Sequence, residues 1–122
     1  MRRLHQYFLC LLFAFSMLPA KAQRLDSLLK VLHNYNKDDS KKLSLLNLAS
    51  IEYKIKDLGA ASKLADAAIE LGKRIKDENG LADAYRIKGE ILNTDGNCTG
   101  ALELLQLSLN QFEALGDRKS VV

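Results

Sequence analysis

The chain has 122 residues, enough for one domain, and 48% of them are hydrophobic, which is enough for a packed core. Its formal net charge of +3 comes from the first 22 residues, which contain Arg2, Arg3 and Lys21 and no acidic residue. Removing these three from the 18 basic residues leaves 15, equal to the 15 acidic residues. The rest of the chain is neutral, so we expect no nucleic-acid partner.

The first 22 residues have the order of a secretory signal peptide. Arg2 and Arg3 are followed by an uncharged run over residues 7–18 and by Ala20-Lys21-Ala22, which matches a signal-peptidase cleavage site. The uncharged run is shorter than the roughly 20 residues that a membrane span needs. We expect cleavage before Gln23, export to the periplasm or outside, and no remaining membrane span. An uncleaved anchor is the alternative.

Cysteine use fits a domain that is held together by packing. Cys10 lies in the signal segment, which leaves Cys98 without an intramolecular disulfide partner. Cys98 is either a reactive or dimer-forming thiol or a small turn residue. It also lies in Asn97-Cys98-Thr99, a three-letter match to a glycosylation site.

Apolar residues recur at helical spacing along the remaining chain, and no stretch alternates with period two. We therefore predict an all-α domain with helices over residues 24–33, 41–55, 60–75, 81–94 and 99–115. Asp39 or Ser40 is expected to cap the second helix, because a short side-chain oxygen can accept from a free N–H there. Turns are predicted at 57–59, 77–80 and 95–97, and Gly116-Asp117 is expected to end the last helix.

Small residues dominate the predicted packing stripes, so neighbouring helices can approach closely. In the second helix the predicted face consists of Leu45, Leu48, Ala49 and Glu52. In the third helix it consists of Ala61, Leu64, Ala65, Ala68, Ile69 and Gly72. In the last helix it consists of Ala101, Leu102, Leu105, Ser108, Leu109 and Phe112.

These stripes repeat at a fixed offset of 40 residues. The pairs are Tyr85 with Leu45, Gly89 with Ala49, Ala101 with Ala61, Leu105 with Ala65, Ser108 with Ala68, Leu115 with Ile75 and Asp117 with Asp77. A constant period in the range of 20 to 50 residues is typical of proteins built from stacked repeats.

The second copy resembles the tetratricopeptide (TPR) repeat. Its matching positions are Tyr85, Gly89, Leu92, Gly96, Ala101, Leu105 and Ser108, and the first copy matches at Leu45, Ala49, Ala61 and Ala68. Lys88 stands where the family commonly has leucine. The resemblance implies antiparallel helical hairpins stacked as a short right-handed superhelix, an α-solenoid. It divides the chain into a degenerate leading helix (23–38), repeats at 39–77 and 78–117, and the start of a truncated repeat (118–122).

The resemblance also implies a partner-binding surface, because the first helices of TPR hairpins line a groove. The positions that would face it are Leu43, Leu46, Ser50 and Tyr53 in one unit and Asp83, Arg86, Glu90 and Asn93 in the next. Leu46 and Tyr53 either contact a partner peptide or cover the leading helix. The second set is either a partner surface or an ordinary solvated face.

The sequence contains no motif that is typical of catalysis or of cofactor binding. His33 is the only histidine after residue 22, and neither a zinc-binding cluster nor a phosphate-binding loop is present in the sequence. The residue types of a Ser-His-Asp triad occur, with Ser27 or Ser40 as the serine, but no sequence motif supports such a triad. We expect a non-enzymatic protein without cofactor or metal.

We therefore predict an exported TPR module that binds a protein or peptide. With the 40-residue period and the leader, it resembles the extracytoplasmic TPR segments of Bacteroidota two-component sensor and regulator proteins. The alternative is an N-terminal fragment of a longer sensor histidine kinase or transcriptional regulator, in which the repeats sense or dimerise. With no following helix to cover them, Leu105, Leu109 and Phe112 are expected to favour self-association.

Overall fold

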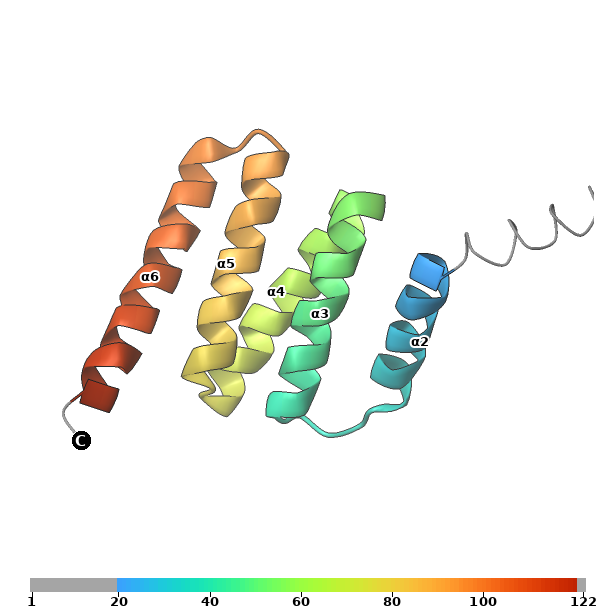
Figure 1. Cartoon of the computed structure of the whole chain (residues 1–122), viewed down its shortest axis with the longest axis horizontal. Helices are drawn as coiled ribbons and strands as arrows, with labels where there is room; N and C mark the ends of the chain where they lie inside the picture. Colours follow the sequence, from blue (N-terminus) through green and yellow to red (C-terminus); the bar gives the residue numbers. More distant parts are fainter. Residues whose placement is uncertain (1–19, 121–122) are drawn as a thin grey trace, which may run out of the picture.

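The structure is a computed structural model that describes residues 20–120, with side-chain surroundings over 25–116. Five helices make up the described part: α2 Ala20–Asn34, α3 Ser40–Lys56, α4 Leu58–Ile75, α5 Glu78–Thr94 and α6 Cys98–Ser120 (Figure 1). Residues 20–120 contain no strand, which confirms the all-α prediction for this part of the chain. The predicted leader falls largely on residues 1–19, outside the described residues, so it stays a prediction.

Short acidic or amide side chains begin four of the helices. Asp39 Oδ1 accepts from the N–H of Lys42 at 3.0 Å, which confirms the predicted cap of α3. The same contact, three residues along, is made by Asp57 with Ala60, Asp77 with Gly80 and Asn97 with Gly100. The last three caps, Asp57, Asp77 and Asn97, are spaced 20 residues apart. One helix and its corner therefore span 20 residues, and two successive helices span 40.

The corners are tighter than predicted. Asp57 ends α3 and caps α4, so the predicted turn at 57–59 is wrong at Leu58 and Gly59, which are helical. Lys76 takes a left-handed conformation with φ 57°, and α5 begins at Glu78, so the predicted loop at 77–80 is also too long. The turn at 95–97 is confirmed, with Gly96 at φ 89°. The corners after α3 and α4 contain only one and two residues, because the capping side chain accepts from a free N–H group of the next helix.

The predicted end of the last helix is wrong. α6 continues through Gly116 to Ser120, so residues 118–120 extend this helix. A glycine inside a helix costs about 1 kcal/mol relative to alanine, which weakens a helix without ending it.

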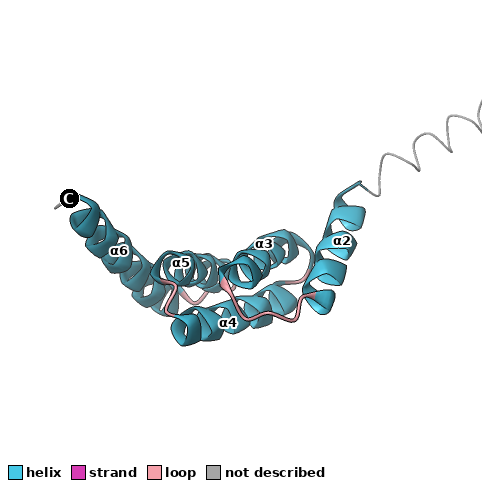
Figure 2. Cartoon of the chain, turned by 90° about the horizontal axis from the view of Figure 1, so that it is seen from below, coloured by secondary structure: helices cyan, strands magenta, loops and turns pink. Residues whose placement is uncertain are grey.

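The helices pack in chain order. Each helix contacts the next one, and α3 also contacts α5. Seen from below, α3 and α5 lie side by side, and α4 lies beneath them (Figure 2). Two buried clusters fill the space between these three helices: Leu43, Leu46, Ala68, Leu71 and Ala84 form the first, and Ala61, Ala65, Ile87 and Ile91 form the second.

The predicted packing stripe of α4 is largely correct. Ala61, Ala65, Ala68 and Gly72 are buried, while Leu64 and Ile69 are half-buried. The predicted packing stripe of α6 is correct at Ala101 and Ser108 and wrong at Leu102, Leu109 and Phe112, which are 69%, 50% and 39% exposed. The exposure of Leu109 and Phe112 agrees instead with the separate expectation that nothing in the described chain covers them.

The matched repeat positions lie where helices meet or turn. Gly89 and Ala101 are buried at the contact between α5 and α6, and a Cβ added to Gly89 would lie 2.8 Å from Leu105 Cγ. Ser108 is buried on the same contact, where its Oγ donates to the carbonyl of Ala82 at 2.8 Å. Of the remaining matched positions, Ala49 is buried, Gly96 forms the turn, and the half-buried ones are Leu45, Tyr85 and Leu92.

Candidate functional site

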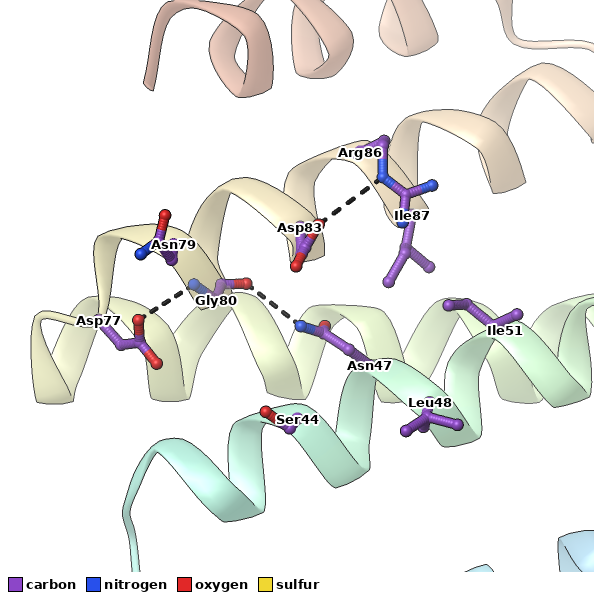
Figure 3. Close-up of a pocket in the computed structure, with 10 residues that line it drawn as sticks. All are labelled: Ser44, Asn47, Leu48, Ile51, Asp77, Asn79, Gly80, Asp83, Arg86 and Ile87. Carbon is purple, nitrogen blue, oxygen red and sulfur yellow. Dashed lines mark hydrogen bonds and ion pairs between the residues drawn. The ribbon is translucent and has the colours of Figure 1, made fainter. Parts of the chain in front are cut away.

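A groove of about 350 Å³ lies between α3 and α5 (Figure 3). On α3 its walls are Ser44, Asn47, Leu48 and Ile51, and on α5 and its N-terminal corner they are Asp77, Asn79, Gly80, Asp83, Arg86 and Ile87. The two helices belong to successive hairpins, so the groove exists only because the hairpins pack side by side.

The floor of the groove is the contact between Asn47 and the first turn of α5. Asn47 is 8% exposed, and its Nδ2 donates to the carbonyl oxygen of Gly80 at 3.2 Å. A Cβ added at Gly80 would overlap the buried side chain of Leu43, so a larger residue here would force Leu43 to shift. Asn47 Oδ1 is buried and has no hydrogen-bond partner among the described residues, which leaves one acceptor at the floor unused.

Exposed apolar side chains stand on the α3 wall, beside the polar Ser44 and Asn47. Leu48 and Ile51 are both exposed, and Ile55, one turn further along α3, is 90% exposed. Together with Ser44 they are spaced four, three and four residues apart, which places them on one face of the helix. An exposed apolar stripe in a concave surface is typical of a binding site.

The α5 wall is charged, and its charges are paired. Glu90 accepts from Lys54 of α3 at 2.9 Å and from Arg86 at 2.6 Å, and Arg86 also lies 3.8 Å from Asp83. Partial burial raises the pKa of Glu90, but the hydrogen bonds and charges of Lys54 and Arg86 outweigh it and lower the pKa overall. The Lys54–Glu90 pair also ties α3 to α5.

Three of the predicted groove residues are not at the surface. Leu43, Leu46 and Ser50 are buried, so the prediction that they face a partner is wrong. Leu43 and Leu46 belong to the first core cluster, against which Leu32 of α2 also packs, and Ser50 Oγ donates to the carbonyl of Ala61 at 2.7 Å. The face of α3 predicted to meet a ligand is therefore covered by neighbouring helices. Tyr53 is half-buried against the second cluster.

The second predicted set is partly assembled. Asp83 and Arg86 line the groove, and Glu90 joins them through the ion pairs described above, whereas Asn93 is exposed and lines no part of it. The sequence reasoning missed Ser44, Asn47 and Ile51, and assigned Leu48 to the packing face. The signal that could have found Leu48 and Ile51 is a second apolar stripe, Leu48, Ile51 and Ile55, with Ser44 on the same face of α3. This spacing does not identify Asn47.

Lys88, which departs from the family pattern, has a structural partner. Its ammonium lies 3.0 Å from Asp66 Oδ1 and also donates to Ser62, both on α4. Its side chain is only 14% exposed, so its stem lies against α4 while its charge is paired. The small and acidic side chains of Ser62 and Asp66 on α4 therefore accommodate the ammonium of Lys88.

The described residues offer little for other chemistry. His33 and Cys98 are both exposed, and residues 20–120 hold no group of three or more His, Cys, Asp or Glu side chains that could bind a metal ion. Within the same part of the chain, every helix is too short or too polar to span a membrane. In comparisons with protein-family models, curated proteins and solved structures, nothing matched the chain.

Proposed function

We propose that the chain is an exported TPR-like module in which two hairpins, α3–α4 and α5–α6, stack as a short superhelix and bind a peptide segment in the α3–α5 groove. Three observations support the stacked arrangement. The helices contact one another in chain order, α3 also contacts α5, and the corner caps recur every 20 residues. In repeat proteins each unit contacts mainly its neighbours, and the surface between successive units serves as the binding face.

The observation that carries the binding proposal is the unlike character of the two groove walls. Leu48 and Ile51 offer apolar surface on α3, whereas Asp83 and Arg86 offer charged groups on α5 (Figure 3). A fitting ligand is a peptide with apolar side chains along one edge and polar groups along the other. Asn47 supplies an unused acceptor between the walls for a ligand N–H, once its side chain turns toward the groove.

Selection from a display library of random peptides tests this proposal, because the library covers many combinations of apolar and polar side chains. We expect enrichment of peptides with spaced apolar residues, and the chain bearing Ile51→Asp should bind a selected peptide about tenfold or more weakly, equivalent to a loss of about 1.4 kcal/mol. The matched control is Leu107→Asp, an exposed leucine on α6 outside the groove. Equal binding by the Ile51→Asp chain, or no enriched peptide, would contradict the proposal.

Export is a separate part of the proposal, and it rests on the order of charge, apolar run and Ala-Lys-Ala at residues 1–22. Expression of the full sequence in a Gram-negative bacterium tests it by mass spectrometry of the periplasmic fraction. A mature protein starting at Gln23 is the expected result. Recovery only from the cytoplasm, with residues 1–22 still attached, would contradict export but leave the groove untouched.

A further inference from the structure

One flank of α6, beside its contact with α5, carries an apolar stripe whose Leu105 packs against Gly89. Leu102, Leu105, Leu109 and Phe112 are all exposed, with spacings of three, four and three residues. This is the heptad spacing by which two helices pair along a seam. We propose that the stripe is the interface with a second copy of this chain, whose own α6 stripe packs against it. The proposal does not depend on the groove, because α6 contributes no residue to it.

The 40-residue repeat shows what the stripe is equivalent to. Moving back by 40 residues converts Leu102, Leu105, Leu109 and Phe112 into Ser62, Ala65, Ile69 and Gly72 of α4. Three of these positions meet α5 directly. Ser62 accepts from Lys88, Ala65 lies in the cluster with Ile87, and a Cβ on Gly72 would lie 3.1 Å from Leu81 Cβ. The stripe thus occupies the positions by which α4 holds the next helix.

The size of the side chains in the α6 stripe decides which partner can pack against it. α4 approaches α5 closely because serine, alanine and glycine stand at the contact. The same positions in α6 are leucine, leucine and phenylalanine, so a helix docked as α5 docks on α4 would overlap them. The distance between packed helices grows with the side chains at the contact. A large-residue seam fits a partner that presents similar residues at the same spacing, and the α6 stripe of a second copy meets this requirement.

Charge does not oppose the pairing of two α6 helices. Between residues 98 and 116 the only charged residues are Glu103 and Glu113. With 3.6 residues per turn, Glu103 lies about 140° around the helix from the centre of the stripe, and Glu113 lies at one edge. Two copies can therefore meet along the stripe without a row of like charges. Such an interface is self-complementary, so each substitution in it acts twice.

Sedimentation velocity over a range of concentrations tests the proposal on the purified chain. It is performed in a Cys98→Ser background, because Cys98 is exposed, lies four residues before Leu102 and can crosslink copies by itself. We expect a reversible dimer. The double variant Leu102→Glu/Leu109→Glu should weaken it by roughly 100-fold or more, because buried apolar anchors dominate such interfaces. Circular dichroism should show retained helix, since both side chains are at least half exposed.

The matched control is Leu107→Glu. Leu107 is exposed to a similar degree but lies about half a turn around α6 from the stripe, so dimerisation should be unchanged. A chain that is monomeric at every accessible concentration would overturn the proposal. So would a dimer that disappears with Cys98→Ser alone, or one that Leu107→Glu weakens as much as the double variant does. Peptide binding in the groove should persist in the monomeric double variant, which keeps the two proposals separable.

Discussion

α5 is packed on two sides, and the two contacts distribute large and small residues in opposite ways. On the α4 side, α5 contributes large residues, Ile87 and Ile91, and α4 contributes Ala61 and Ala65. On the α6 side, α5 contributes Ala82 and Gly89. There α6 places Leu105 against Gly89, and Ser108 against Ala82.

The 40-residue pattern therefore predicts that two helices approach closely, but it does not predict which of the two contributes the small side chains. The α4–α5 contact is a continuous apolar cluster, whereas the α5–α6 contact combines Gly89 against Leu105 with the hydrogen bond from Ser108 to Ala82. Ala101 and Ser108 of α6 are buried at this contact, whereas Leu102, Leu107 and Leu109 remain exposed. We therefore expect the α4–α5 contact to be sensitive to cavities and the α5–α6 contact to be sensitive to added volume.

The largest effect is expected at Ile87, the most deeply buried of the large residues on the α4 side of α5. Ile87→Ala should lower the free energy of unfolding by about 2–5 kcal/mol, because it removes buried methylene groups and leaves a cavity. Urea titration followed by circular dichroism measures this value. Ile55→Ala is the matched control, since Ile55 is 90% exposed and its loss should change stability by less than about 0.5 kcal/mol.

On the other side of α5, Gly89→Ala should destabilise by about 1–3 kcal/mol through overpacking. The added Cβ would lie 2.8 Å from Leu105 Cγ and 3.3 Å from the Ala101 carbonyl oxygen. Adding Leu105→Ala should recover part of the loss, so the two substitutions should couple in a double-mutant cycle. Gly116→Ala, where an added Cβ meets nothing within 4 Å, should be neutral or stabilising. Additive effects of Gly89→Ala and Leu105→Ala would mean that the contact between α5 and α6 yields to the added methyl group.

A smaller effect is expected from the side-chain caps, which make the same contact in the two hairpins although their corners differ in length. Asp57→Ala and Asn97→Ala each remove the side-chain acceptor that caps a helix, from Ala60 and Gly100 respectively. Each should cost about 1 kcal/mol by thermal unfolding. Asp95→Ala is the control, because Asp95 is an exposed residue of the second corner that closes α5 through its backbone N–H. A cap variant no less stable than the control would show that the corners do not depend on these side chains.

The spacing of small residues in the sequence predicted where two helices come close. It did not predict which face of a helix is buried. Gly89, Ala101 and Ser108 are predicted correctly because small residues at a fixed offset indicate a close helix contact. Leu102 is wrongly predicted to face inward because it continues an apolar run next to Ala101. One residue corresponds to about 100° around a helix, so adjacent apolar residues belong to different faces, and only the neighbouring helix decides which face is buried.

The same limit explains the candidate site. Leu43 and Leu48 both belong to apolar stripes on α3, and periodicity alone gives no reason to choose between them. The structure buries Leu43 against the first turn of α5, at Gly80, and leaves Leu48 in the groove.

The predicted corners are too long for a different reason. Asp57 and Asp77 have the polarity of loop residues, although a carboxylate that caps a helix allows the next helix to start one residue later.

The smallest effect is expected from the charged link between α3 and α5, because half-exposed ion pairs contribute little to stability. Burial opposes the charge of Glu90, but Lys54 and Arg86 lower its pKa overall, so the folded chain holds this proton less tightly than the unfolded chain. The contribution is therefore present above the ordinary glutamate pKa of about 4.3 and is lost as the pH falls through the lowered pKa.

Unfolding free energies measured by urea titration from pH 7 downward should show a gap between the wild type and Glu90→Gln that closes in acid. The control is Glu113→Gln, an exposed glutamate on α6 outside this cluster, which should follow the wild-type curve. A gap that stays constant with pH would mean that Glu90 acts through packing and not through its charge.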